Sequence, residues 1–132
     1  MRKPEKEANA LKIQQSAEDY LEAMLILREK RGYIRSVDIA RELNFSKPSV
    51  SIAVKKLREN GYLSVDEDGL IRLTESGEKI AANTYARHKL LTELLIRLGV
   101  DEATAREDAC RIEHDISEVT FEALKKHAEA MA

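Results

Sequence analysis

Hydrophobic side chains recur every three to four residues along most of this chain, which is the spacing of a helix with one buried face. The first such stretch covers residues 16–31, and it follows a polar arm at residues 1–14 that either frays or extends the helix. Ser16 suits the N-cap and Gly32 the end of this helix. The apolar positions that would face inward are Tyr20, Leu21, Met24, Leu25 and Leu27.

Two further helices are predicted with only Asn44 and Phe45 between them. The first follows Ser36 and is short. The second has Ser46 as its N-cap and Pro48 in its first turn, where the missing N–H needs no partner. Its core stripe is Val50, Val54 and Leu57. Two helices joined by so short a link have the proportions of a helix-turn-helix.

The hydrophobic period changes after Gly61. The runs Leu63–Val65 and Leu70–Leu73 flank the sequence DEDG, in which Asp68-Gly69 is a strong turn signal. This stretch therefore predicts a β-hairpin. A helix-turn-helix followed at once by a hairpin is the arrangement of a winged helix.

Helical periodicity returns for the rest of the chain. Thr74 caps a long helix that ends at Gly99, Asp101 caps one over residues 102–116, and Ser117 caps the last. The predicted fold class is mainly α with a small β-hairpin wing, in which a winged helix-turn-helix is followed by a helical dimerisation region. We expect two domains, residues 1–74 and 75–132, with the transition inside the long helix near residues 75–85.

A leucine stripe on the long helix is the expected dimer contact. The alternative is that this stripe only fills the core of its own chain. Its members are Leu90, Leu91, Leu94, Leu95 and Leu98.

Composition narrows the class of protein. At 132 residues, with 43% hydrophobic and 35% charged residues, the chain fits one compact domain or two small ones. No apolar run reaches the roughly 18 residues of a membrane span, and the charged N-terminus is unlike a signal peptide, so we expect a cytoplasmic protein without a membrane partner. The single cysteine excludes an intramolecular disulfide and, with three histidines, a closed structural zinc finger.

The net charge of −2 conceals an uneven distribution. Residues 1–60 hold 13 Lys and Arg against 9 Asp and Glu, a net +4, whereas residues 61–132 hold 9 against 15, a net −6. A basic half and an acidic half favour an anionic partner for the first and a cation or a protein for the second. Ordinary charge scatter is the alternative.

The second helix of the helix-turn-helix is the expected DNA-reading helix. Its first turn would meet base edges in the major groove, its lysines would contact phosphates, and the preceding helix would offer N–H groups to another phosphate. Ile52 points away from the core stripe and would either touch a thymine methyl or pack against a loop. The predicted DNA-contacting residues are Arg35, Ser36, Ser46, Lys47, Pro48, Ser49, Ser51, Ile52, Lys55 and Lys56.

The strongest cluster of potential metal ligands is Cys110, Glu113 and His114. On a helix these residues share one face, so thiolate, carboxylate and imidazole would converge on a divalent ion. The alternatives are an amphipathic turn with a buried thiol, and nucleophilic catalysis, for which no oxyanion element is evident. Asp19 and Glu22 also share a helical face, but alone they suit helix capping and a surface charge.

The order EDYLE, winged helix, RHKLL and ACRIEH, spread over residues 16–128, resembles the metal-dependent repressors typified by the diphtheria toxin repressor and the manganese transport regulator. The resemblance implies a homodimeric transcription factor, not an enzyme. It would repress metal-uptake genes at palindromic operator DNA when Fe(II) or Mn(II) bridges its two domains. The metal ligands that it implies are Asp19, Glu22, His88, Cys110, Glu113 and His114.

The sequence departs from both branches of that family. The manganese branch typically has a glutamate at the position of Cys110, and the iron branch has a methionine at that of Asp19. Two ancillary ligands of the iron branch fall on Thr92 and Arg106, which would not complete that site. A thiolate favours softer ions and the acids harder ones, so Fe(II) is slightly preferred over Mn(II), while Zn(II), Co(II) or Ni(II) would compete in vitro. The rival functions are a metal-independent winged-helix regulator that senses an organic ligand, and a small metalloenzyme.

Overall fold

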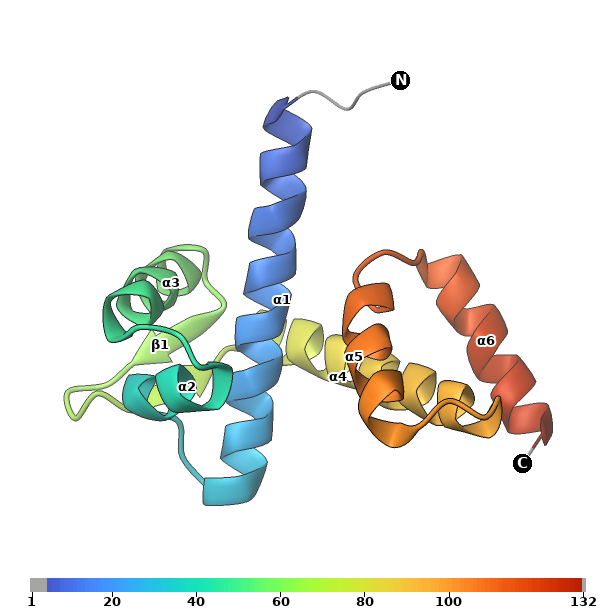
Figure 1. Cartoon of the computed structure of the whole chain (residues 1–132). Coiled ribbons are helices and arrows are strands. Elements are labelled where there is room, and N and C mark those ends of the chain that lie inside the picture. Colours follow the sequence, from blue (N-terminus) through green and yellow to red (C-terminus); the bar gives the residue numbers. More distant parts are fainter. Residues whose placement is uncertain (1–4, 132) are drawn as a thin grey trace. The chain divides into compact units, whose positions relative to one another are not determined.

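The computed structural model describes residues 5–131, with side chains from residue 16 onward, and the described chain is mainly helical with one hairpin (Figure 1). It divides into two compact units, Met1–Ala82 and Asn83–Ala132. This architecture confirms the predicted fold class, whereas the domain boundary after residue 74 stays a prediction. The elements are α1 (Glu5–Arg31), α2 (Ser36–Leu43), α3 (Lys47–Glu59), β1 (Leu63–Val65), β2 (Ile71–Leu73), α4 (Glu75–Arg97), α5 (Glu102–Ile112) and α6 (Glu118–Met131).

The first unit gathers α2, α3 and the hairpin beside α1. Every element contributes to one core, whose most deeply buried apolar side chains are Leu21, Met24, Leu27, Ile34, Ile39 and Val50. Ser16 is not an N-cap, because α1 begins at Glu5 and Ser16 lies inside it. Of the two alternatives for the polar arm, the structure shows extension of the helix. Part of the predicted polar arm is therefore helical, and residues 1–4 lie outside the described chain.

The helix-turn-helix follows the predicted chemistry. Asn44 ends α2 in the left-handed conformation, with φ of 56°, which an asparagine tolerates better than most residues. The Ser46 side chain then accepts a hydrogen bond from the Ser49 N–H, and Pro48 lies in the first turn of α3. The stripe Val50, Val54 and Leu57 is buried as expected.

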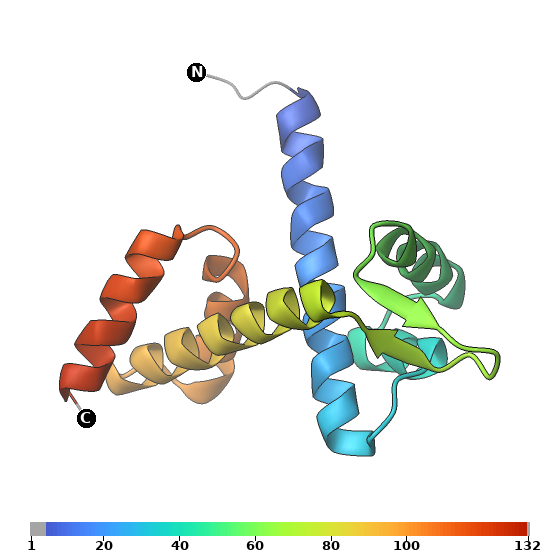
Figure 2. The ribbon, with the colours of Figure 1, turned by 180° about the vertical axis from the view of Figure 1, so that it is seen from behind.

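The wing is an antiparallel hairpin (Figure 2). Its register pairs Leu63 with Leu73 and Val65 with Ile71. The Asp66 carboxylate organises the turn, because Oδ1 accepts hydrogen bonds from the N–H groups of Asp68 and Leu70. Gly69 has φ of 80°, which suits the residue at that position. Residues 66–69 are all exposed, so the turn presents three acidic side chains to solvent.

The first turn of α4 is fastened to the connection between α3 and β1. The Thr74 N–H donates to the Tyr62 carbonyl, and the hydroxyls of Thr74 and Ser76 donate to the Gly61 carbonyl. A Cβ atom placed on Gly77 would lie 2.0 Å from the Tyr62 carbonyl oxygen. At Gly77, α4 therefore lies so close to the Tyr62 backbone that only glycine, which has no side chain, fits there.

The second unit contains the later part of α4 together with α5 and α6. Asp101 and Ser117 cap α5 and α6 as predicted, by accepting from the N–H groups of Thr104 and Thr120. The expected helix over residues 102–116 is too long, because α5 ends at Ile112. The buried residues of the second unit include Leu91 of α4, Ala105 and Ala109 of α5, and Phe121 of α6.

The leucine stripe of α4 is only partly buried in the single chain. Leu91 is 5% exposed, whereas Leu98, the first residue after α4, is 81% exposed. Filling of the chain's own core therefore does not account for the whole stripe.

No helix within residues 5–131 combines the length and apolar character that crossing a lipid bilayer requires.

Candidate metal centre

His88 from α4 lies beside Cys110 and Glu113 from the end of α5. One potential ligand atom from each residue lies within 4.8 Å of the other two. α5 ends at Ile112, but its C-cap Glu113 keeps a helical conformation and its N–H donates to the Ala109 carbonyl, whereas His114 lies beyond the helix. The Glu113 carboxylate lies close to His88 of α4.

The Glu113 carboxylate is the buried centre of this cluster, with a side chain 0% exposed. Its Oε2 atom lies 3.0 Å from Nδ1 of His88. Its Oε1 atom lies 3.4 Å from Nε2 of His114 but accepts no hydrogen bond in the described part of the chain. A buried carboxylate oxygen without a hydrogen bond is costly, and a cation would offset that cost.

The neighbours of His88 favour the protonated, positively charged form of its side chain. Hydrogen bonds with Cys110 and then Glu113 raise the pKa of His88 to about 10, against the opposing effect of burial. Without metal, the His88 side chain is therefore protonated at neutral pH and supplies the positive charge beside Glu113.

This raised pKa predicts how the metal-free protein responds to pH. Because the folded-state pKa exceeds the unfolded value of about 6.5, the pairing of His88 stabilises the fold fully below that value. The contribution is lost as pH rises towards about 10. Urea unfolding at pH 6, 8 and 10 with a chelator present should show wild type losing more stability than His88→Gln. Equal losses in the two proteins would contradict this assignment.

The donor set fits a first-row divalent ion. Ligand atoms bound to one such ion at roughly 2.0–2.3 Å lie a few ångströms apart, as the atoms of His88, Cys110 and Glu113 do. Imidazole, thiolate and carboxylate together suit Fe(II), Mn(II) and the later metals of the series. Cys110 is exposed, so the cluster has a side that faces solvent.

The other predicted ligands lie on α1 of the first unit and just beyond α5. Asp19 and Glu22 are one turn apart on α1, where Asp19 is half-buried and Glu22 is buried. The His114 side chain is 4% exposed. The two ancillary positions carry other interactions, since the Thr92 hydroxyl donates to the His88 carbonyl and Arg106 pairs with Glu102.

Sequence reasoning missed Arg87, the neighbour of His88. This arginine donates hydrogen bonds to main-chain carbonyls of the connection between α5 and α6 and pairs with Glu118 of α6. Its only signal in the sequence is its position beside a candidate ligand, because its partners follow 26 to 31 residues later.

The predicted DNA-contacting residues lie on α3 and at the start of α2. Lys47, Lys55 and Lys56 are exposed, and Arg35 is the N-cap residue of α2. Ile52 is 58% exposed, so no loop within the described residues covers it. The Ser46 hydroxyl is already committed to Ser49 in capping α3.

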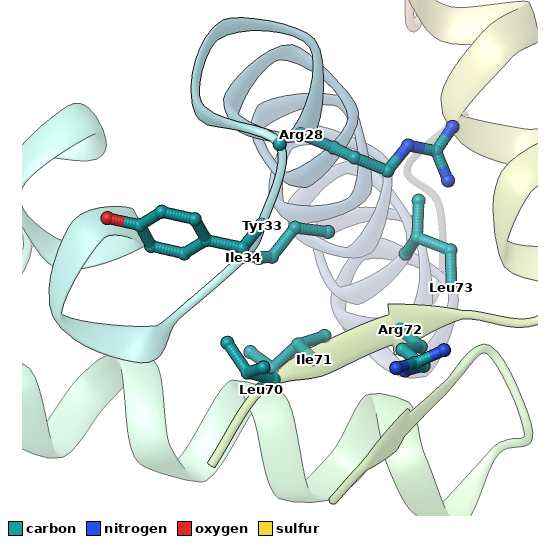
Figure 3. A pocket seen from close by; sticks show the side chains of 8 residues that line it. Arg28, Tyr33, Ile34, Leu70, Ile71, Arg72 and Leu73 are labelled. Atoms are coloured by element: carbon teal, nitrogen blue, oxygen red, sulfur yellow. The ribbon is translucent and has the colours of Figure 1, made fainter. Parts of the chain in front are cut away.

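The first unit contains a pocket (Figure 3). None of its lining residues belongs to the metal cluster. It has a volume of about 400 Å³ and is lined by Arg28 of α1, by residues 32–34 of the loop that follows α1, and by Leu70 with strand β2. Two arginines, Arg28 and Arg72, contribute to an otherwise largely apolar lining that contains no acidic residue, histidine or cysteine. It therefore offers no ligand set for a metal ion.

Nearly the whole chain matches two known domains. Residues 12–70 match the "Iron dependent repressor, N-terminal DNA binding domain", and residues 74–131 match the "Iron dependent repressor, metal binding and dimerisation domain". The first match covers the helix-turn-helix, and the second covers α4, α5 and α6.

Individual relatives agree with these domain matches. An uncharacterized helix-turn-helix transcriptional regulator of Methanocaldococcus jannaschii is 37% identical over 86% of this chain and 92% of its own length. The transcriptional regulator MntR of Lysinibacillus sphaericus is 38% identical over 77% of this chain and 73% of its own.

Solved structures give the same result. The crystal structure of IdeR from T. acidophilum has a TM-score of 0.75 and 30% identity over 85% of this chain, and the manganese regulator SloR has a TM-score of 0.75 and 32% identity over 86%. The chain spans 53% of the length of each of these two structures.

Proposed function

This chain belongs to the iron-dependent repressor family, and on that premise we propose that it represses metal-uptake genes when Fe(II) or Mn(II) joins its two domains. Members of this family are metal-dependent transcriptional regulators and not enzymes. Its matched domains make DNA and a second copy of the chain its partners. The observation that carries the proposal is the buried Glu113 carboxylate between two histidines.

The proposed ligands come from both units. Our set comprises Asp19 and Glu22 of α1 with His88, Cys110, Glu113 and His114. For the ligands of the second unit, the support is that the ligand atoms of His88, Cys110 and Glu113 lie within 4.8 Å of one another. When bound, the ion would supply the positive charge that a buried carboxylate and a thiolate require. His88 must give up its proton to bind, because imidazole coordinates metals only when it is neutral.

We favour Fe(II) slightly over Mn(II) as the physiological ion. The Cys110 thiolate shifts preference towards softer ions, whereas the carboxylates of Asp19, Glu22 and Glu113 keep a harder ion competitive. The Irving–Williams order implies that Zn(II), Co(II) and Ni(II) would bind more tightly in vitro. Related regulators are described as manganese-dependent, and the relative ScaR has been crystallised with Zn²⁺ and with Cd²⁺.

The proposed DNA-reading surface is the exposed side of α3 with the start of α2. Its lysines would neutralise phosphates, while the first turn of α3 and the exposed Ile52 would face base edges. A dimer presents two such helices, which fit a palindrome when they lie about 34 Å or a multiple apart. A metal ion that bridges the two units would select that arrangement from the other arrangements of the dimer. The protein would act in the cytoplasm.

The test is to select binding sites from random duplex DNA with Mn(II) present, and to measure affinity for the selected site with Mn(II), with Fe(II) under anaerobic conditions, and with chelator. Metal should raise affinity by roughly 5- to 150-fold, the usual range of allosteric coupling. Affinity that is the same with and without both metals would rule the proposal out.

A second function, sensing of an organic ligand, is favoured by the pocket of about 400 Å³ in the first unit. Arg28 already pairs with Glu78, so Arg72 and the apolar lining are the groups that a small organic acid would contact. This alternative requires operator affinity to respond to such an acid and the melting temperature to be indifferent to divalent metals.

A further inference from the structure

Arg87 of α4 contacts the connection between α5 and α6 and the first turn of α6. Its Nη1 atom donates to the main-chain carbonyl oxygens of Glu113 at 3.2 Å and Ile116 at 2.8 Å. Its Nη2 atom lies 2.8 Å from Oε2 of Glu118, and its side chain is only 12% exposed. The guanidinium also lies over the Phe121 ring, with Cζ 5.2 Å from the ring centroid.

These contacts satisfy carbonyl groups in the connection between α5 and α6, because Glu113 is the C-cap of α5 and Ile116 precedes Ser117, the N-cap of α6. A backbone carbonyl that is removed from water needs a hydrogen-bond partner, and the C-terminal end of a helix also carries a partial negative charge. A planar guanidinium can satisfy two carbonyl oxygens and a carboxylate at the same time, which a lysine cannot do with the same geometry. Arg87 thus holds the connection between α5 and α6 in place.

The same connection contains the carboxylate at the centre of the metal cluster. Arg87 binds the main-chain carbonyl of Glu113, and the side chain of Glu113 approaches His88, the next residue of α4 after Arg87. The backbone and the side chain of Glu113 are therefore held by consecutive residues of one helix.

We propose that Arg87 is a positioning residue for the metal centre, which fixes the Glu113 backbone so that its carboxylate faces His88 and Cys110, and ties that arrangement to α6. The inference rests on the proposed function for the identity of the cluster as a metal site. Groups that orient metal ligands typically change metal affinity by roughly 10- to 100-fold when they are removed.

The experiment compares Arg87→Gln and Arg87→Lys with wild type, and uses Arg97→Gln as the matched control. Arg97 lies on the same helix, but it pairs with the exposed Glu93 one turn away. Co(II) is titrated as the probe, and its visible absorption spectrum reports the geometry of the bound ligands. Amide hydrogen exchange over residues 113–118 is measured on the metal-free proteins.

Arg87→Gln should lower Co(II) affinity by roughly 10- to 100-fold, alter the Co(II) spectrum and speed exchange over residues 113–118. Arg87→Lys should fall between this variant and wild type, because it keeps the charge but loses the planar fork. It also provides the comparison if Arg87→Gln does not fold. Arg97→Gln should match wild type in all three measurements.

Wild-type Co(II) affinity and spectrum in both Arg87 variants would overturn the positioning role, even if exchange becomes faster. Unchanged hydrogen exchange would show that Arg87 does not hold the connection between α5 and α6 in place. A wild-type protein that binds no Co(II) would instead contradict the proposed metal site. Exchange in the metal-free proteins separates these two failures, because it does not depend on a metal.

Discussion

Gly77→Ala should destabilise the first unit by about 3 kcal/mol, as insertion of an atom into a filled space does. The added Cβ would lie 2.0 Å from the oxygen and 2.9 Å from the carbon of the Tyr62 carbonyl. That carbonyl cannot easily withdraw, since it accepts the Thr74 N–H and its neighbour Gly61 accepts two hydroxyls. Helix propensity alone predicts the opposite sign, a gain of about 1 kcal/mol over glycine.

Urea unfolding monitored by circular dichroism decides between these signs. Gly69→Ala is the control, because Gly69 has open space around it but a φ of 80°. It should cost about 1–2 kcal/mol through backbone strain alone. A Gly77→Ala protein as stable as wild type would mean that α4 can move away from Tyr62 at little cost.

Glu113→Gln should abolish activation by metal while it leaves the helices formed. Glutamine keeps the size of the side chain but removes the charge from a site that is 0% exposed and faces His88. Loss of a ligand should cost at least the roughly 100-fold that loss of an orienting group can cost. Mn(II) affinity and operator binding with saturating Mn(II) are the measurements.

Glu102→Gln is the matched control for that substitution. Glu102 lies in the first turn of α5 and pairs with Arg106 in solvent, so its loss removes an exposed ion pair and no cluster contact. It should retain the wild-type response to Mn(II). A Glu113→Gln protein that also retains it would remove Glu113 from the ligand set.

The sequence predicted the helix-turn-helix and the wing because their signals are local. Ser46, Pro48 and the Asp68-Gly69 turn each act within four residues of themselves, and the structure confirms all three. The error at Ser16 has the opposite origin. A serine that can cap a helix can also lie inside one, and α1 continues through it from Glu5.

Part of the candidate site was also predictable. Cys110, Glu113 and His88 lie close together. Helical spacing selected Cys110 and Glu113, whereas His88 was added only by the resemblance. The spacing argument nevertheless assumed a helix through residue 116, whereas α5 ends at Ile112. Arg87 could not be found this way, because its role depends on carbonyl groups that only the folded chain brings to it.

The acidic turn of the wing has a consequence for how the protein meets DNA. Asp66, Glu67 and Asp68 are exposed at the tip of the hairpin, and the carboxylate of Asp66 is held there by two N–H groups. Phosphates repel this tip while they attract the lysines of α3, and both effects weaken as salt is added. If α3 is the DNA-reading helix, as proposed, this repulsion would disfavour docking by the tip of the hairpin and favour approach of the duplex to α3.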